Sequence, residues 1–158
     1  MTPKREGYLS WDECFMLMAE LIAQRSKDPS TQAGSVIVND QKIVVGLGYN
    51  GFPRGIADEK LPWSREGSFL ETKYPYVVHA EENAIYNSNA STKGCTLYAT
   101  LFPCNECAKT IIQNGVKEVV YASDKYHDQD QWKAARKMFD EAGVSYRQFA
   151  SGRKLRIE

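Results

Sequence analysis

The sequence lacks long hydrophobic runs, internal repeats and an excess of charge of either sign. Without an apolar stretch of about 18 residues we expect no membrane span, and the polar residues 1–7 give no indication of a secretory signal. Twenty basic residues balance 20 acidic ones, so the overall positive charge that is typical of polynucleotide-binding proteins is missing. A length of 158 residues suits a single globular domain, which we expect to span residues 1–158.

Histidine and cysteine are also scarce, yet half of them fall in one pattern. One of the two histidines, His79, stands two residues before Glu81, and Cys104 and Cys107 follow Pro103 as Pro-Cys-x-x-Cys. Histidine and cysteine are zinc ligands, and three protein ligands leave one position of a tetrahedral ion open for water, as in catalytic sites. His-x-Glu followed by Pro-Cys-x-x-Cys is typical of zinc nucleobase deaminases, in which the glutamate acts as general acid and base.

We expect Cys104 and Cys107 in the first turn of a helix that begins after Pro103, since proline favours that position. There they would share one face, and the helix dipole and free N–H groups would lower their thiol pKa values. A Cys-x-x-Cys pair can instead be a redox pair or half of a structural zinc site, but Cys14 and Cys95 stand alone and supply no second pair. Two zinc-bound thiolates and two unpaired cysteines fit a reducing compartment, so we expect a cytoplasmic protein.

The hydrophobic pattern predicts an α/β protein. Ser10 and Glu13 match a capping box, and apolar residues at helical spacing follow to about residue 24. Two β-branched runs, residues 33–39 and 43–48, flank a polar turn and predict a hairpin. Further along, the pattern predicts helices near residues 79–87, 103–114 and 132–143, which alternate with strands near 95–100, 116–122 and 144–149. This order predicts a three-layer α/β/α fold around a five-stranded mixed sheet.

Some connecting segments carry residues that suit ligand binding. Arg25, Ser26 and Lys27 place two cations and a hydroxyl at the end of the first helix. They could hold a phosphate or merely complement the helix C-terminus, and both interpretations stay open. Residues 48–55 form a glycine-rich loop that can wrap a small ligand or simply turn. Residues 56–76 show no regular period, and a connection of this length is typical of a lid, an effector site or a subunit contact.

Seven stretches spread over nearly the whole chain resemble the deoxycytidylate (dCMP) deaminase family. They are residues 9–11, 25–29, 48–51, 72–77, 79–81, 101–109 and 123–128. The zinc motif alone indicates the wider cytidine deaminase superfamily, and the other stretches narrow it to the nucleotide-level enzyme. The resemblance implies a cytidine deaminase-like fold and one zinc ion on His79, Cys104 and Cys107. It also implies hydrolysis of dCMP to dUMP and ammonia, which feeds thymidylate synthesis, with Glu81 carrying the proton.

The resemblance further implies a substrate site, regulation and assembly. It places the turn at residues 25–27 at the nucleotide phosphate, Asn50 near the sugar and Tyr126 over the pocket. Enzymes of this family are often hexamers that dCTP activates and dTTP inhibits. The full set implied at the substrate is Arg25, Ser26, Lys27, Asn50, Ala80 and Tyr126, and the residues suited to an effector are Gly51, Phe52, Arg54 and Gly55. Neither a membrane nor a polynucleotide is expected as a partner.

Glu82 departs from the family, which usually has an apolar or neutral residue at this position. Because Glu82 lies three residues after His79, helical geometry alone makes it as good a candidate base as Glu81, and only the motif favours Glu81. Two other functions stay open. A deaminase could act on a polynucleotide such as tRNA by base flipping, or the chain could be a zinc-stabilised interaction module without turnover.

Overall fold

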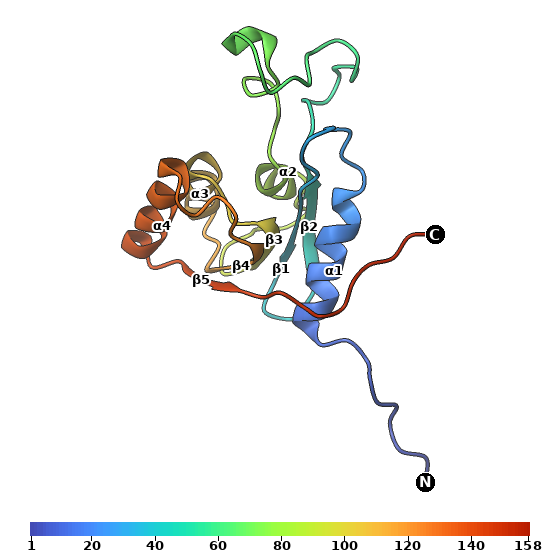
Figure 1. Ribbon diagram of the computed structural model, residues 1–158. Coiled ribbons are helices and arrows are strands. Elements are labelled where there is room, and N and C mark those ends of the chain that lie inside the picture. Colours follow the sequence, from blue (N-terminus) through green and yellow to red (C-terminus); the bar gives the residue numbers. More distant parts are fainter.

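The computed structural model describes residues 1–158, and a five-stranded mixed sheet with strand order β2-β1-β3-β4-β5 lies at its centre (Figure 1). Strand β1 pairs antiparallel with both β2 and β3, whereas β3, β4 and β5 run parallel. The strands are β1 (Gly34–Val38), β2 (Val44–Tyr49), β3 (Thr96–Leu101), β4 (Glu118–Ser123) and β5 (Ser145–Gln148). The predicted hairpin and mixed sheet are confirmed.

Helices cover both faces of the sheet, so the predicted three-layer α/β/α arrangement is confirmed (Figure 1). Alternate side chains of the central strands point to opposite faces. Tyr98 and Val120 pack with α1 (Trp11–Ala23) on one face. Leu97 and Val119 pack on the other face with the buried side chains of the remaining helices. These helices are α2 (Ala80–Tyr86), α3 (Asn105–Gln113) and α4 (Asp130–Ala142).

Helix α1 is fixed to the sheet through its first turn. The predicted capping box is present: the Glu13 amide donates to Ser10 Oγ, and the Ser10 amide donates to Glu13 Oε1. Next to it, the Asp12 carboxylate accepts from the Tyr98 hydroxyl at 2.5 Å and from two Arg147 guanidinium nitrogens at 2.9 Å. One side chain of α1 therefore contacts both β3 and β5.

Helix α2 lies almost directly on the backbone of β2. A Cβ atom at Gly46 or Gly48 would collide with the Ala84 backbone, so only glycine permits this approach. Asparagines then occupy the outer edge of β2. The carbonyls of Val45, Leu47 and Tyr49 accept from the Asn89 amide at 3.0 Å, Asn87 Nδ2 at 3.0 Å and Asn83 Nδ2 at 2.7 Å. The position of α2 is thus set by backbone contact and by three hydrogen bonds to one strand.

The long connection between β2 and α2 contains only one short 3-10 helix, η1 (Phe69–Glu71), and projects beyond the end of the sheet (Figure 1). Its last part returns to the body, where Val78 and Gly51 exchange backbone hydrogen bonds of 2.8 and 3.1 Å. The C-terminal segment runs past α1, and Arg153 forms a 2.8 Å ion pair with Glu13 (Figure 1). No helix combines the length and the apolar character needed to cross a bilayer.

Candidate zinc and catalytic site

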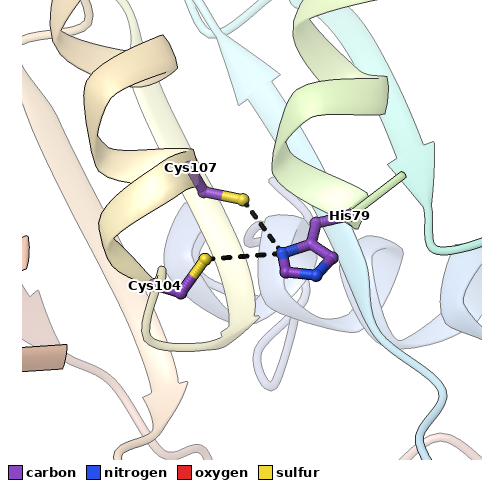
Figure 2. Close-up of side chains that lie close together, drawn as sticks. All are labelled: His79, Cys104 and Cys107. Carbon is purple, nitrogen blue, oxygen red and sulfur yellow. Dashed lines mark hydrogen bonds between the residues drawn. The ribbon is translucent and has the colours of Figure 1, made fainter. Parts of the chain in front are cut away.

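The three sequence-predicted ligands meet between the N-termini of α2 and α3 (Figure 2). His79 Nδ1 lies 3.5 Å from Cys104 Sγ and 3.3 Å from Cys107 Sγ. Zinc–sulfur bonds of about 2.3 Å and zinc–nitrogen bonds of about 2.0 Å at tetrahedral angles separate nitrogen and sulfur by about 3.5 Å. The donor set and its spacing therefore fit one zinc ion. Cys104 and Cys107 are buried, whereas His79 is exposed, and Cys14 and Cys95 lie outside this group.

One detail of the prediction is wrong. Cys104 does not lie in the first turn of α3 but is the N-cap residue with an extended backbone (φ −74°, ψ 175°), and His79 is likewise the N-cap of α2. Pro103 therefore precedes the cap instead of beginning the helix. Both ligands sit where a helix leaves backbone N–H groups free, so each side chain can turn toward the ion and away from its own helix axis.

Helix α4 supports the turn that carries Cys104. Trp132 Nε1 donates to the Phe102 carbonyl at 2.8 Å, and the guanidinium carbon of Arg136 lies 4.0 Å from the centre of the Phe102 ring. Phe102 is 2% exposed and packs edge-on against Tyr121. The sequence gives little indication of this support, because Trp132 fits the apolar face of its helix equally well.

Without a metal ion, the pKa values of the three ligand side chains are shifted in different directions. Hydrogen bonds from Cys107 and His79 lower the pKa of Cys104 to about 4, and the hydrogen bond to Cys104 raises the pKa of His79 to about 9. The hydrogen bond with Cys104 and burial raise the pKa of Cys107, because the two sulfurs cannot both ionise cheaply at this distance. The remaining protons on His79 and Cys107 are those that a bound zinc ion displaces.

The structure separates the two candidate carboxylates. Glu81 is 7% exposed, and burial raises its pKa to about 7, with contributions of both signs from its neighbours His79, Cys104 and Cys107. Glu82 is half-buried; its Oε1 lies 3.9 Å from Cys107 Sγ, and its Oε2 accepts from the Tyr86 hydroxyl at 3.4 Å. A carboxyl group that titrates near neutral pH is suited to move a proton in both directions, which favours Glu81.

Ser26 and Asn50, two of the predicted substrate residues, lie together. Ser26 Oγ donates to the Asn50 carbonyl at 2.9 Å. The buried Asn50 amide is largely used within the protein: Nδ2 donates to the Thr31 carbonyl at 2.9 Å and to Asp28 at 3.4 Å, while Oδ1 accepts from the Ala33 amide at 2.8 Å. One acceptor position on Oδ1 stays free, since a carbonyl oxygen has two lone pairs.

The other predicted substrate residues are more dispersed. Arg25 is exposed on the α1 side of the sheet, with its guanidinium carbon 5.9 Å from the centre of the Tyr49 ring. Lys27 forms a 3.2 Å ion pair with Asp58 of the long connection. Tyr126 packs against Trp132 with ring centroids 4.8 Å apart, and Ala80 is buried beside Glu81.

The glycine-rich loop borders a cavity of about 200 Å³. The four residues considered for an effector, Gly51, Phe52, Arg54 and Gly55, line this cavity together with Lys27 and Asp58. The Phe52 ring stacks on Trp63 at 4.0 Å, and Arg54 donates to the Asn87 side chain at the end of α2. The loop is thus bonded to the helix that follows His79, which the sequence pattern did not reveal.

Comparison with known proteins agrees with this geometry. Residues 9–123 match the family model described as cytidine and deoxycytidylate deaminase zinc-binding region. The chain belongs to the cytidine and deoxycytidylate deaminase family. Deoxycytidylate deaminases of Homo sapiens and Pongo abelii are 58% and 59% identical to this deaminase over 148 residues, which span 92% of this chain and 83% of each relative.

A solved structure also resembles this deaminase closely. The dCMP deaminase of cyanophage S-TIM5, in complex with dCMP and dUMP, superposes with a TM-score of 0.69 at 30% identity, covering 87% of this chain and 95% of the phage chain. The predicted family, the cytidine deaminase-like fold and the zinc-dependent hydrolytic chemistry are thereby confirmed. The interaction module without turnover is not supported.

Proposed function

We propose that this deaminase hydrolyses dCMP to dUMP and ammonia and so supplies dUMP for thymidylate synthesis. The observation that carries the proposal is the zinc-ligand trio with the buried Glu81 beside it. The relatives named deoxycytidylate deaminase and the phage neighbour in complex with dCMP and dUMP support the choice of substrate. Four free cysteines support a reducing, cytoplasmic location.

The chemistry follows from the residues around the trio. His79, Cys104 and Cys107 would hold a zinc ion, which when bound would acidify a water so that a nucleophile is available near neutral pH. Glu81 accepts a proton from that water and delivers one to N3 of the cytosine, which makes C4 more electrophilic. The oxygen of the water forms a bond to C4. Glu81 then takes the second proton from this oxygen and passes it to the amino group, the C4–N bond breaks, and ammonia leaves. In the metal-free site, burial raises the pKa of Glu81 to about 7, and a carboxyl group of this kind is suited both to accept and to return a proton.

We assign the sugar and phosphate to the side of the site formed by residues 25–27, Asn50 and Tyr126. Because Asn50 Oδ1 has one free acceptor position and Nδ2 is fully used, Asn50 can accept from a sugar hydroxyl but has no spare donor. Arg25 is exposed and forms no ion pair, so its guanidinium is free to bind two phosphate oxygens.

We further assign the cavity beside the glycine-rich loop to a nucleotide effector, dCTP as activator and dTTP as inhibitor, in a hexameric assembly. Lys27 and Arg54 bring two cations to this cavity against the single carboxylate of Asp58. The aromatic pair of Phe52 and Trp63 offers a face on which a base can stack. Lys27 therefore suits the effector as well as the substrate phosphate.

The function is tested by measuring ammonia release from dCMP, CMP, dCTP, deoxycytidine and a tRNA, with Arg25→Ala beside the wild type. We expect dCMP to be the best substrate. Loss of one charge-assisted phosphate contact costs about 1.5–3 kcal/mol, so Arg25→Ala should lower the catalytic efficiency on dCMP about ten- to a hundredfold. Slow activity on deoxycytidine should hardly change.

Deoxycytidine is the internal control, because a folding defect lowers activity on both substrates. Equal loss on dCMP and deoxycytidine in a variant that retains zinc would remove Arg25 from the phosphate site. Preference of the wild type for tRNA, or ammonia release from none of the five substrates, would contradict the proposed function itself.

A further inference from the structure

Three charged side chains are buried in this protein, namely Asp28, Lys73 and Glu81. Glu81 belongs to the catalytic site, whereas Asp28 and Lys73 have no role in the chemistry described so far. They form an ion pair of 2.5 Å, with side-chain exposures of 1% and 9%. The pair links the turn after α1 to the long connection, 45 residues apart in the sequence.

Asp28 is the centre of a closed polar network. Its Oδ1 accepts from the backbone amides of Ser30 at 2.8 Å and Thr31 at 3.2 Å. Its Oδ2 accepts from Lys73 Nζ and, at 3.4 Å, from Asn50 Nδ2. Both carboxylate oxygens are therefore satisfied, and the carboxylate shapes the turn after α1 while contacting the side chain proposed to meet the sugar.

Lys73 lies at the start of the segment that carries His79. Its carbonyl accepts from the backbone amides of Tyr76 at 3.0 Å and Val77 at 3.0 Å, which forms a turn just before Val78. Val78 then pairs with Gly51, the residue after Asn50. The segment that leads to His79 is therefore held at two points: the ion pair joins it to the turn after α1, and the backbone bridge joins it to the end of β2, next to Asn50.

A purely stabilising role explains this arrangement poorly. Replacing a buried ion pair by apolar residues is often neutral or stabilising, because desolvation offsets the attraction between the charges. A buried ion pair can, however, specify how two segments meet, because both charges are satisfied only when the segments are correctly placed. Lys73 cannot serve the substrate phosphate, because its ammonium is buried against Asp28.

We propose that Lys73 is a positioning residue, which together with Asp28 holds the turn of Ser26 and the Asn50 side chain against the segment that carries His79. The assignment of Ser26 and Asn50 to the substrate rests on the proposed function. In this arrangement the pair sets the distance between the zinc ligands and the sugar side of the pocket, and it takes no part in proton transfer.

The test replaces the pair by neutral residues in the double variant Lys73→Met/Asp28→Asn, so that no unpaired charge is left buried. The matched control is Lys117→Met/Asp40→Asn, since Lys117 and Asp40 form an exposed ion pair between other segments. Zinc content, KM and kcat for dCMP, and backbone amide hydrogen exchange are measured on the zinc-loaded proteins.

We expect the Lys73 double variant to keep stoichiometric zinc and to raise KM for dCMP about ten- to a hundredfold, with a much smaller change in kcat, because the substrate is misplaced. The amides of Ala33 and Gly51 should exchange at least about tenfold faster, whereas those of β4 keep their rates. The control variant should match the wild type in every measurement.

An unchanged KM together with unchanged exchange at Ala33 and Gly51 would overturn the proposal. Failure of the double variant to fold or to hold zinc would also overturn it, because the pair would then be a determinant of folding as a whole. A wild type that does not deaminate dCMP would refute the proposed function, while the exchange measurement would still decide the positioning role.

Discussion

At the residue scale, burial distinguishes two adjacent carboxylates that the sequence leaves nearly equivalent. Glu81 and Glu82 both follow His79 within one helical turn, and both approach Cys107. Glu81 is enclosed, and burial raises its pKa to about 7, whereas Glu82 lies nearer the surface beside Tyr86. The His-x-Glu motif points to position 81, and the packing of α2 against β2 buries the side chain at that position.

We predict that Glu81→Gln retains zinc but loses about a hundred- to ten-thousandfold in kcat, since glutamine can neither accept nor return the proton. Glu82→Gln, the matched control one residue away, should stay within a few-fold of the wild type. Steady-state kinetics on dCMP with zinc determined on the same samples measures both. An exchange of the two outcomes would assign the base to Glu82.

Some features of the site could be predicted from individual residues, and others could not. The zinc ligands were identifiable because histidine, proline and two cysteines at fixed spacing point to one chemistry. The location of Cys104 at the helix cap was not, because proline is favoured both before and within the first turn. The pairing of Asp28 with Lys73 could not be predicted, since nothing in the sequence around Asp28 indicates that a lysine 45 residues away becomes its buried partner.

At the element scale, α1 and the sheet are joined by one carboxylate. The hydrogen bonds from Arg147 lower the pKa of Asp12, and the Tyr98 hydroxyl adds to this effect. Because the pKa of Asp12 is lower in the folded state than the usual value near 3.8, the ionised form stabilises the fold. That contribution is complete at neutral pH and is lost as the pH falls through the folded-state pKa, below about 4.

We predict that Asp12→Asn lowers the free energy of unfolding at pH 7 by about 1–2 kcal/mol, a value reduced because Arg147 is nearly half exposed. The difference from the wild type should stay constant between about pH 7 and 5 and shrink below about pH 4. Denaturant titrations at several pH values measure it. Asp130→Asn, an exposed acidic residue in the first turn of α4, controls for the helix dipole.

If Asp12→Asn and Asp130→Asn destabilised the protein equally at pH 7, the ion pair would add nothing to the dipole effect.

The helices and strands themselves were largely predictable, because periodicity and caps are local features of the sequence. The capping box and the helix end at Gly143, which has φ 76°, were both confirmed. The contact of Asp12 with two strands depends on tertiary packing and was beyond any local pattern.

At the scale of the whole molecule, the unusual part is the connection between β2 and α2. It exposes the large apolar side chains of Phe69 and Leu70, which are 70% and 68% accessible, on a projecting segment (Figure 1). The same connection borders the cavity of the glycine-rich loop through Asp58 and Trp63. The length of this connection predicted a special role. Its path could not be predicted, because residues 56–76 show no regular hydrophobic pattern.

We predict that dCTP raises and dTTP lowers the rate of dCMP deamination in a hexamer, and that Arg54→Ala weakens both responses at least about tenfold in effector concentration, as expected for a lost charge-assisted contact. Kinetics with each effector and sedimentation analysis measure these properties. Lys60→Ala, an exposed cation of the same connection that does not line the cavity, should respond like the wild type.

Persistence of both effector responses in Arg54→Ala would move the effector away from this cavity. If the protein proved to be a monomer that still responds to dCTP, regulation by the nucleotide would not depend on the hexamer, contrary to the proposed function.

The asparagines along β2 have a consequence for how copies of this protein can associate. An edge strand with free carbonyls is a template on which a foreign strand can add, which is the first step toward a continuous intermolecular sheet. Here the carbonyls of Val45, Leu47 and Tyr49 already accept hydrogen bonds from the α2 segment. A strand from another molecule would have to displace these donors and lift α2 from its glycine contacts. This edge is therefore protected against aggregation by strand addition, and the protection comes from the same helix that follows the zinc ligand His79.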